Sequence, residues 1–269
     1  MPQIHPTAIV DPKAQLADSV TVGPFTIIEG RVVIGDDTHI GSHTVIRDYT
    51  TIGARCRIFQ FATVGEIPQD LKFRGEETRL TIGDDNTIRE YATLHRGTAG
   101  GGGLTSIGNG NLLMAYTHIA HDCHVGQGVI MSNAATLAGH IIVEDYAILG
   151  GLSAIHQFCR IGRHAFIGGC SAVPRDVPPY LMAVGNRAKL VGLNLVGLKR
   201  HGLTDSSIQP LKKAYEILFL SGVNLKEGMA QVRQELPDLP EIQHLLHFIE
   251  TSERGLCPSN GREDRLNRG

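Results

Sequence analysis

Residues 119–143, IAHDCHVGQGVIMSNAATLAGHIIV, repeat one feature every six positions. Ile119, Val125, Met131, Leu137 and Val143 form a series of large apolar side chains separated by small or polar residues. An amphipathic helix would repeat its apolar face every three or four residues, and a half-buried strand would alternate every two. A strict period of six therefore indicates short strands separated by turns, each strand directing one large side chain inward.

The same period extends over most of the chain that precedes residue 174. One series begins at Ile4 and a second at Ile107, and neither contains an exception. Chance does not produce this, because aliphatic residues are a minority in an average chain. The two series are Ile4, Val10, Leu16, Val22, Ile28, Ile34, Ile40, Ile46, Ile52, Ile58 and Val64, and then Ile107, Leu113, Ile119, Val125, Met131, Leu137, Val143, Leu149, Ile155, Ile161, Ile167 and Val173.

The spacing of the small residues completes the repeat. Ala62, Ala135 and Cys159 each stand four positions after a large residue, and glycines such as Gly41 and Gly126 often follow one directly. This pattern predicts a triangular prism with three strands per coil, that is, a parallel β-solenoid in which eighteen residues make one turn. It resembles the hexapeptide-repeat proteins, a likeness which implies a left-handed parallel β-helix and departs from the usual right-handed crossover.

Two segments interrupt the repeat. Residues 65–81, GEIPQDLKFRGEETRLT, break the inward pattern, and residues 95–106, HRGTAGGGGLTS, shift its phase by one. Long segments that leave a regular scaffold are often functional loops. We expect a functional role here, because the first segment carries Asp70 and Lys72 and the second begins with His95. The alternative is a tolerated surface insertion.

The chain after the prism has a helical period. Three helices are predicted, over DSSIQPLKKAYEILFLSG (205–222), LKEGMAQVRQEL (225–236) and EIQHLLHFIETSER (241–254). Thr204 or Asp205 is expected to cap the first, Asn224 the second, and Gly255 to end the third. Pro210 should kink or delay the first helix.

These patterns predict two domains, with the prism ending near residues 174–180. Residues 1–186 are expected to form the β-helix and residues 187–269 a C-terminal α-helical domain. The last dozen residues, PSNGREDRLNRG, are expected to be frayed.

The composition excludes several classes of protein. The 25 Lys and Arg nearly balance the 27 Asp and Glu, which argues against broad nucleic-acid binding. Five cysteines without a CxxC pair favour a reducing compartment. The chain shows neither a signal peptide nor an apolar run long enough to cross a membrane. We therefore expect a cytoplasmic protein with no integral membrane segment and no nucleic-acid partner.

The 13 histidines are numerous for this length, and the stretch HIAHDCHVGQG (118–128) spaces three of them by three residues. On a helix they would converge on a metal ion, but on this prism His118 and His124 should lie on different faces. His121 should lie near a corner and point outward. A zinc site between subunits and a hydrated polar ridge without chemistry both remain open.

The coil of eighteen residues favours acid–base chemistry instead. Residues eighteen apart should stack about 4.8 Å apart, which places Gly139 above His121 and His140 above Asp122. Histidine suits proton transfer at neutral pH, and Asp122 could orient its ring. The Gly139 N–H would be open to a developing oxyanion. Such a site suits attack of a substrate hydroxyl or amine on a thioester.

Several motifs resemble one family over essentially the whole chain, the UDP-N-acetylglucosamine acyltransferases that begin lipid A synthesis. They are IPQDLKFRGEETRL, TLHRGT, NLLMAYTHIAHDC, ATLAGH, AIHQFCRIG, GGCSAVPRDVPPY and LVGLKRHG. The resemblance implies a cytoplasmic homotrimer with active sites between neighbouring prisms. It implies transfer of an (R)-3-hydroxyacyl chain from acyl carrier protein to the 3-position of UDP-N-acetylglucosamine. The acyl donor is then carried on the phosphopantetheine of acyl carrier protein, and no cofactor or metal is expected.

The resemblance also implies roles for individual residues. His121 would be the general base, Asp122 would hold its tautomer and the Gly139 N–H would receive the oxyanion. Gly169 would set acyl length, since a glycine leaves room for a longer chain, although it could equally be an ordinary turn residue. The remaining residues would bind the sugar nucleotide and acyl donor, and they are Gln69, Asp70, Lys72, His95, His118, His140, His156, Gln157, Asn194 and Arg200.

Two positions depart from the pattern of the family. Residues 194–201, NLVGLKRH, carry Val196 where an acid is usual and His201 where an arginine is usual, which puts contacts to the nucleotide in doubt. A basic patch of Lys199, Arg200, Lys212 and Lys213 could dock the acidic carrier protein, or could be no more than solvated helix surface.

The resemblance leaves rival functions to be tested. They are a related sugar N-acyltransferase, an acetyl-CoA-dependent sugar acetyltransferase, a zinc hydratase and a non-catalytic scaffold. The sequence does not determine the acyl length, nor whether the acceptor is a 3-hydroxyl or a 3-amino sugar.

Overall fold

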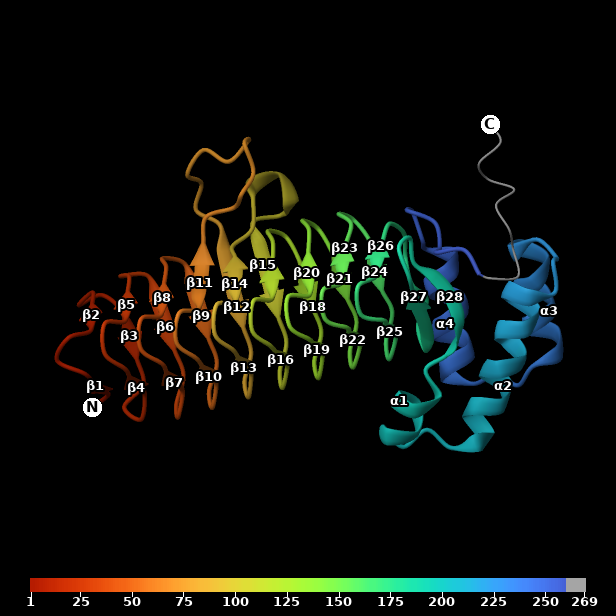
Figure 1. Cartoon of the computed structure of the whole chain (residues 1–269), viewed down its shortest axis with the longest axis horizontal. Helices are drawn as coiled ribbons and strands as arrows, with labels where there is room; N and C mark the ends of the chain where they lie inside the picture. The colour runs from red at the N-terminus through yellow and green to blue at the C-terminus, as the bar shows by residue number, and fades with distance from the viewer. Residues whose placement is uncertain (260–269) are drawn as a thin grey trace.

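The computed structural model describes residues 1–259 and has the predicted prism followed by a helical region (Figure 1). Three parallel sheets, here faces A, B and C, follow one another in the order A, B, C along every coil. The register pairs residues eighteen apart, for example His118 with Thr136 and Ile119 with Leu137. The predicted coil length is therefore confirmed.

The strands are short because each face turns after about two residues. Face A contains β1 (Gln3–Ile4), β4 (Thr21–Val22), β7 (His39–Ile40), β10 (Arg57–Ile58), β13 (Thr87–Ile88), β16 (Leu112–Leu113), β19 (Ile130–Met131), β22 (Ile148–Leu149), β25 (Phe166–Ile167), β27 (Leu181–Val184) and β28 (Lys189–Leu193). Face B contains β2 (Ile9–Val10), β5 (Ile27–Ile28), β8 (Val45–Ile46), β11 (Thr63–Glu66), β14 (Thr93–His95), β17 (His118–Ile119), β20 (Thr136–Leu137), β23 (Ala154–Ile155) and β26 (Ala172–Val173). Face C contains β3 (Gln15–Leu16), β6 (Val32–Ile34), β9 (Thr50–Ile52), β12 (Arg79–Ile82), β15 (Leu104–Ile107), β18 (His124–Val125), β21 (Ile142–Val143) and β24 (Arg160–Ile161).

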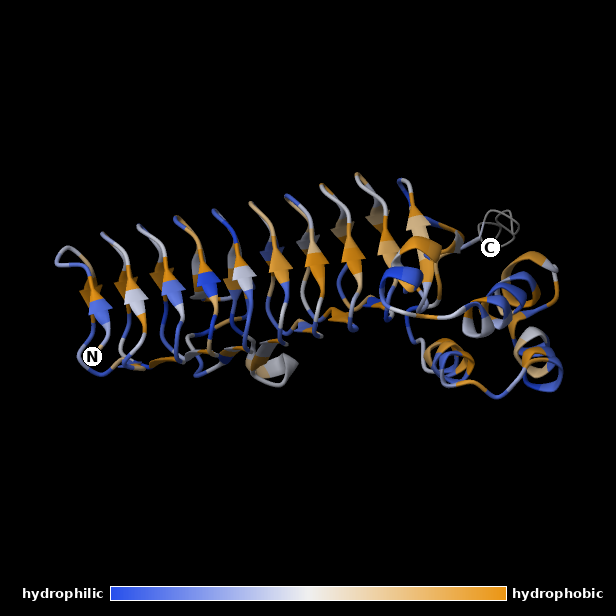
Figure 2. Ribbon diagram, turned by 90° about the horizontal axis from the view of Figure 1, so that it is seen from below, coloured by the Kyte–Doolittle hydropathy of each residue, from blue (hydrophilic) through white to orange (hydrophobic). Residues whose placement is uncertain are grey.

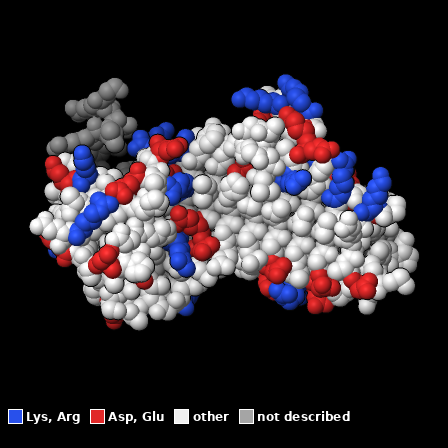
Figure 3. Space-filling view, turned by 180° about the vertical axis from the view of Figure 1, so that it is seen from behind, with Lys and Arg blue, Asp and Glu red and all other residues white. Residues whose placement is uncertain are grey.

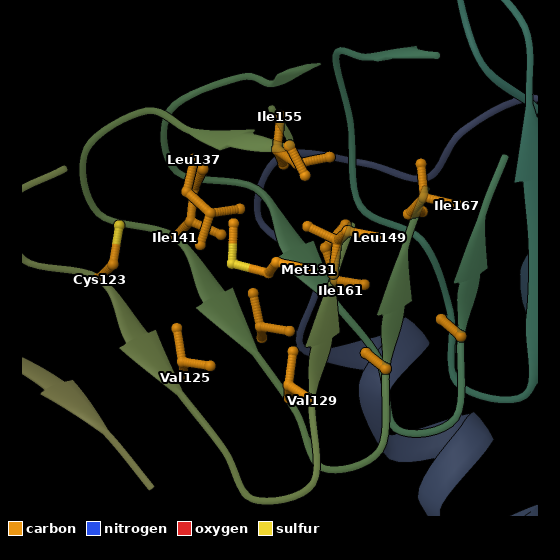
Figure 4. Packing of buried hydrophobic residues seen from close by; sticks show 14 of the residues in the cluster. Cys123, Val125, Val129, Met131, Leu137, Ile141, Leu149, Ile155, Ile161 and Ile167 are labelled. Atoms are coloured by element: carbon orange, nitrogen blue, oxygen red, sulfur yellow. The ribbon is translucent and has the colours of Figure 1, made fainter. Parts of the chain in front are cut away.

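The six-residue series forms the core of the prism. Leu137, Leu149 and Ile161 are fully buried, and they stack along the axis with Met131, Ile155 and Ile167 (Figure 4). The small residues fit beside them, and Ala135 and Cys159 are likewise fully buried. Apolar segments recur in successive coils along the whole prism (Figure 2). Each coil therefore covers the apolar edge of its neighbour.

The corners impose a backbone conformation that the sequence pattern did not reveal. Residues at corresponding turn positions, among them Tyr91, Asp122, His140 and Tyr146, have φ between 58° and 61°, a left-handed conformation that disfavours side chains. The aromatic side chains among them stack on one another along the corners, whereas Asp122 is buried. On the corner between faces A and B, the rings of Phe61, Tyr91 and Tyr116 are spaced 5.1 and 4.9 Å apart.

The two interruptions are insertions at the corner between faces B and C. Arg57 pairs with Thr87, thirty residues on instead of eighteen, and Thr93 pairs with His118, twenty-five residues on. The first insertion is shorter than predicted, because Glu66 and residues 79–81 belong to strands and Leu80 is fully buried. The loops, residues 67–78 and 96–103, project side by side (Figure 1), and the second contains the 3-10 turn η1 (Ala99–Gly101).

The prism continues past its predicted end. β27 pairs in parallel with β25, and β28 returns antiparallel to it, so face A extends to Leu193. The predicted boundary between residues 186 and 187 lies in the turn of this hairpin, and the helices begin at Leu195. This last hairpin has a period of two and carries no hexapeptide signal.

The helical region contains α1 (Leu195–Arg200), α2 (Asp205–Tyr215), α3 (Leu225–Glu235) and α4 (Pro240–Glu250), with the π-helical turn η2 (Glu216–Leu220) continuing α2. Asn224 Oδ1 accepts from Glu227 N at 2.9 Å, so the predicted cap of α3 is confirmed. The predicted delay of the first helix at Pro210 was wrong, because α2 begins at Asp205 and contains Pro210. The third predicted helix ends at Glu250 rather than near Gly255.

Two further details differ from the expectations. The six-residue helix α1 was not predicted, because Gly197 interrupts a very short apolar pattern. The last dozen residues were expected to be frayed, yet Leu190 N donates to Pro258 O at 2.8 Å and Ser259 is buried. Residues 260–269 lie outside the described part. Within residues 1–259, no helix has the length and apolar character to cross a membrane.

Candidate active site

Three histidines, His121, His140 and His156, lie in successive turns along the corner between faces B and C and are here called the histidine ridge. Both loops project from the same corner. His121 and Asp122 lie in the turn between β17 and β18, and His140 lies in the same turn one coil later. His118 begins β17 on face B, whereas His124 begins β18 on face C. His118 and His124 therefore lie on different faces, as the prism geometry predicted, whereas His118 stays close enough to His121 that, after burial, His121 also lowers the pKa of His118.

His121 and Asp122 form a hydrogen-bonded pair. The distance from His121 Nδ1 to Asp122 Oδ2 is 2.8 Å. The Asp122 side chain is 1% exposed and that of His121 is 15% exposed. Because an ionised carboxylate only accepts hydrogen bonds, Nδ1 carries the proton and Nε2 is left as the basic atom. The pair can thus orient the ring and stabilise an imidazolium.

The loop of residues 96–103 holds Asp122 from the other side. Thr98 N donates to Asp122 Oδ1 at 2.8 Å, and Thr98 Oγ1 donates to Oδ2 at 2.6 Å. Gly101 packs so closely that an added Cβ would lie 2.1 Å from Asp122 Cγ. Sequence reasoning missed these residues, and the only signal was that the TAGGGG run interrupts the repeat.

Gly139 lies against the His121 ring, as the stacking predicted. A Cβ added at Gly139 would lie 2.6 Å from His121 Cε1 and 2.8 Å from Nε2, and His140 N donates to His121 O at 3.0 Å. Among residues 1–259 the Gly139 N–H has no hydrogen-bond acceptor. Only glycine leaves room for this ring, and its N–H stays available for a bound group.

The neighbouring histidines are held neutral. Burial, and then the nearby His118, lower the pKa of His95 to about 4, and burial lowers the pKa of His118. Thr93 Oγ1 lies 2.7 Å from His118 Nδ1. Burial also lowers the pKa of His140, while the opposing charges of Asp122 and Asp70 raise it. This places Asp70, on the loop of residues 67–78, near the ridge.

One coil further on, His140 stacks on Phe158 at 4.5 Å, beside His156 and Gln157. Arg254, from the segment after α4, contacts His156 through Nη2 and Nδ1 at 2.7 Å. Sequence reasoning did not single out Arg254, because nearly a hundred residues separate it from His156 in the chain.

His121, Asp122 and His140 also offer two ring nitrogens and a carboxylate oxygen within 4.8 Å of one another. Such atoms can bind zinc. Here, however, Asp122 Oδ2 already accepts from Thr98 Oγ1 and contacts the His121 ring, which accounts for the cluster without an ion.

The other predicted site residues lie at separate places. Gln69 and Lys72 are exposed on the projecting loop, which carries basic side chains (Figure 3). Gly169 lies on the corner between faces A and B, where an added Cβ would approach only Gly151 O, at 3.3 Å. It therefore lies on a different corner from His121.

Asn194 caps the start of α1 and Arg200 is its last residue, at the corner between faces C and A. The Asn194 side chain is buried, accepts from Gly197 N at 3.0 Å and donates to His164 O at 3.0 Å, so it caps α1. His201 packs 4.8 Å from the Tyr146 ring. Two cavities of about 350 and 290 Å³ lie here against α4, and Arg163, Tyr180 and Glu241 line both.

Comparisons with known proteins agree with this architecture. Residues 176–257 match a family model described as UDP-N-acetylglucosamine O-acyltransferase, domain 2, and residues 13–48 and 104–139 match the bacterial transferase hexapeptide repeat. An acyl-[acyl-carrier-protein]–UDP-N-acetylglucosamine O-acyltransferase of Anaeromyxobacter dehalogenans is 56% identical over 253 residues, which are 94% of this chain and 98% of the relative. The enzyme of that name from Thermodesulfovibrio yellowstonii is 56% identical over 96% of this chain and its own full length.

Solved structures show the same fold. LpxA from Acinetobacter baumannii is 48% identical, with a TM-score of 0.92 over 94% of this chain and 99% of that one. The UDP-N-acetylglucosamine acyltransferase of Francisella novicida is 41% identical, with a TM-score of 0.93 over 96% and 95%. The predicted left-handed parallel β-helix with a C-terminal helical region is thereby confirmed.

Proposed function

The chain belongs to the UDP-N-acetylglucosamine O-acyltransferase family, and we propose that it moves an (R)-3-hydroxyacyl chain from acyl carrier protein to UDP-N-acetylglucosamine. The relatives are named for O-acyl transfer, so the acceptor atom proposed is the 3-hydroxyl oxygen of the sugar. The reaction would be the first step of lipid A synthesis. No cofactor takes part in it beyond the phosphopantetheine that carries the acyl group on its protein donor.

The juxtaposition of His121 with Gly139 is the observation that carries the mechanism. His121 Nε2 takes the proton of the sugar hydroxyl as its oxygen attacks the thioester carbonyl carbon. The carbonyl oxygen becomes negatively charged and accepts a hydrogen bond from the Gly139 N–H. The C–S bond then breaks, and the leaving thiolate takes the proton back from His121. The products are an ester and the free thiol, and no enzyme nucleophile is required.

Asp122 keeps the base in the correct form throughout. Its carboxylate accepts from His121 Nδ1 at 2.8 Å, which leaves Nε2 unprotonated toward the substrate. Thr98 supplies two further hydrogen bonds at 2.8 and 2.6 Å, so the carboxylate keeps its position while the imidazolium forms. Neutral His95 and His118 surround the base without competing for protons.

We infer that the complete site forms between copies of the chain in a homotrimer. The base lies on the corner between faces B and C, Gly169 on that between A and B, and Arg200 on that between C and A. One chain cannot bring three corners of its own prism together, whereas neighbouring prisms can. The exposed rings of Phe61, Tyr91 and Tyr116 form an apolar ridge suited to such contact. The mass in solution should be three times 29.1 kDa.

The test is product analysis with purified protein. A panel of (R)-3-hydroxyacyl carrier-protein thioesters with UDP-N-acetylglucosamine should give a 3-O-acyl product by mass spectrometry, and His121→Ala should lower kcat by about 10²-fold or more. His124→Ala is the matched control, because His124 lies on face C away from the pair. Unchanged turnover in His121→Ala would refute the mechanism, and bound zinc by elemental analysis would favour metal chemistry.

The same panel would report on acyl length. A side chain at Gly169 would enter open space beyond Gly151 O, so we propose that Gly169→Met shifts the preferred acyl chain to a shorter one. The cytoplasmic location inferred from composition stays a prediction.

A further inference from the structure

The segment that follows α4 returns to the prism beside the histidine ridge. It is tied there at Asp176, whose N–H donates to Gly255 O at 2.9 Å and whose carbonyl accepts from Cys257 N at 2.9 Å. Ser252 Oγ donates to Asp176 Oδ2 at 2.6 Å. These bonds lie on both sides of Arg254, so its backbone is held by the last coil.

The Arg254 side chain reaches two groups of the prism. Its Nε donates to Pro174 O at 3.0 Å, and its Nη2 lies 2.7 Å from His156 Nδ1. The first bond directs the guanidinium, and the second joins the C-terminal segment to a residue of the B–C corner. No other contact of the His156 ring with a charged side chain occurs within residues 1–259.

The chemistry of arginine determines the protonation of His156. A guanidinium stays charged and has five N–H donors but no acceptor. The ring nitrogen facing it must therefore accept, so Nδ1 carries no proton and the neutral ring has its proton on Nε2. The Gln157 carbonyl, 3.2 Å from Nδ1, then receives no hydrogen bond from this ring.

We propose that Arg254 is a positioning residue that fixes His156 as a donor through Nε2–H to an oxygen of the sugar nucleotide. The identity of that ligand rests on the proposed function. The tautomer of His156 does not, because it follows from the contact with Arg254 alone. The proposal gives His121 and His156, which lie on the same corner, different chemical roles. Asp122 makes His121 Nε2 a base, whereas Arg254 makes His156 Nε2 a donor, and each partner does so through Nδ1.

The tautomer can be measured without any activity. Long-range proton–nitrogen NMR of protein labelled with ¹⁵N-histidine distinguishes the two forms, and His156→Gln identifies the signals of His156. The natural protein should show the Nε2–H form. Arg254→Met removes the donor, so Nδ1 should gain a proton and donate to the Gln157 carbonyl. Arg254→Lys keeps a cationic donor without an acceptor and should retain the Nε2–H form.

Steady-state kinetics tests the consequence for binding. Arg254→Met should raise KM for the sugar nucleotide about fivefold, the scale of one lost hydrogen bond, with kcat nearly unchanged. Arg254→Lys should recover most of that loss. Arg233→Met is the control, because Arg233 pairs with Glu250 at 2.6 Å on the helices and has no contact with the ridge.

The outcomes separate the two proposals. An Nδ1–H ring in the natural protein, or an unchanged tautomer in Arg254→Met, would overturn the role of Arg254 even if acyl transfer is found. The expected tautomers without any acyl transfer would support Arg254 and refute the proposed function. If Arg254→Met fails to fold, the tautomer of the natural protein still tests the proposal, because an Nδ1–H ring there would overturn it.

Discussion

Two adjacent glycines allow a sharp test of how Asp122 is held. At Gly101 an added Cβ would lie 2.1 Å from Asp122 Cγ, 2.2 Å from Oδ2 and 2.4 Å from Oδ1. At Gly100, in the same 3-10 turn, an added Cβ meets no atom within 4 Å. Neither glycine has a positive φ, so alanine is compatible with the backbone at both positions. Gly101→Ala therefore displaces the carboxylate, and Gly100→Ala does not.

The expected size of the effect follows from the distances. Ordinary contact begins at 3.4 Å, so the carboxylate or the turn must move by about 1 Å or more, which is enough to cost about 10²-fold in rate. The hydrogen bond to His121 Nδ1, now 2.8 Å, would be lost or badly aligned. We expect kcat to fall about 10²-fold with little change in KM, because Asp122 acts on the base. Crowding should lower stability by about 1–3 kcal/mol.

The assay compares initial rates of acyl transfer for the two variants and the natural protein, with thermal melting as the check on folding. Gly100→Ala should match the natural protein in both measurements. A folded Gly101→Ala protein with undiminished kcat would show that Asp122 need not be held by this turn. Equal losses in both variants would assign the effect to the loop as a whole.

Three further predictions concern the same corner and the helical region. Gly139→Ala would place a methyl group 2.6 Å from the His121 ring, so kcat should fall about 10²-fold although the N–H remains; an active variant would remove the close-packing argument. The pKa of His95 is about 4 in the fold and about 6.5 when unfolded, so the unfolded chain binds more protons between these values. Stability should therefore fall by about 3 kcal/mol between pH 6.5 and pH 4, and His95→Gln should flatten that dependence in urea unfolding series. Charge reversal of Lys212 and Lys213 should raise KM for the carrier protein but not for the sugar nucleotide, and an unchanged KM would remove the docking patch.

The regular coil was predictable because each coil repeats the same local chemistry. In each strand, one large and one small side chain point inward. Residues eighteen apart, such as His121 and Gly139, then stack in successive coils. The sequence predicted too long a first insertion, because buried Leu80 lies in a strand within a segment whose sequence is irregular. The hairpin ending at Leu193 escaped detection because a strand pair of period two carries no hexapeptide signal.

Contacts between segments that are far apart in the sequence could not be predicted from it. Thr98 reaches Asp122, and Arg254 reaches His156, only because the corners and the last coil bring them together. Nothing in a local pattern distinguishes Gly101, which touches a carboxylate, from Gly100, which faces open space.

The sequence by itself determined the β-helix, its coil length, the divergence of His118 from His124 and the family, because these depend on a local period and on motifs. Only the tertiary structure decided that Asp122 and Thr98 lie against His121 and that Arg254 lies against His156, and that the predicted site residues lie on three different corners. Those facts depend on long-range contacts, whose energy comes from segments that are far apart in the chain.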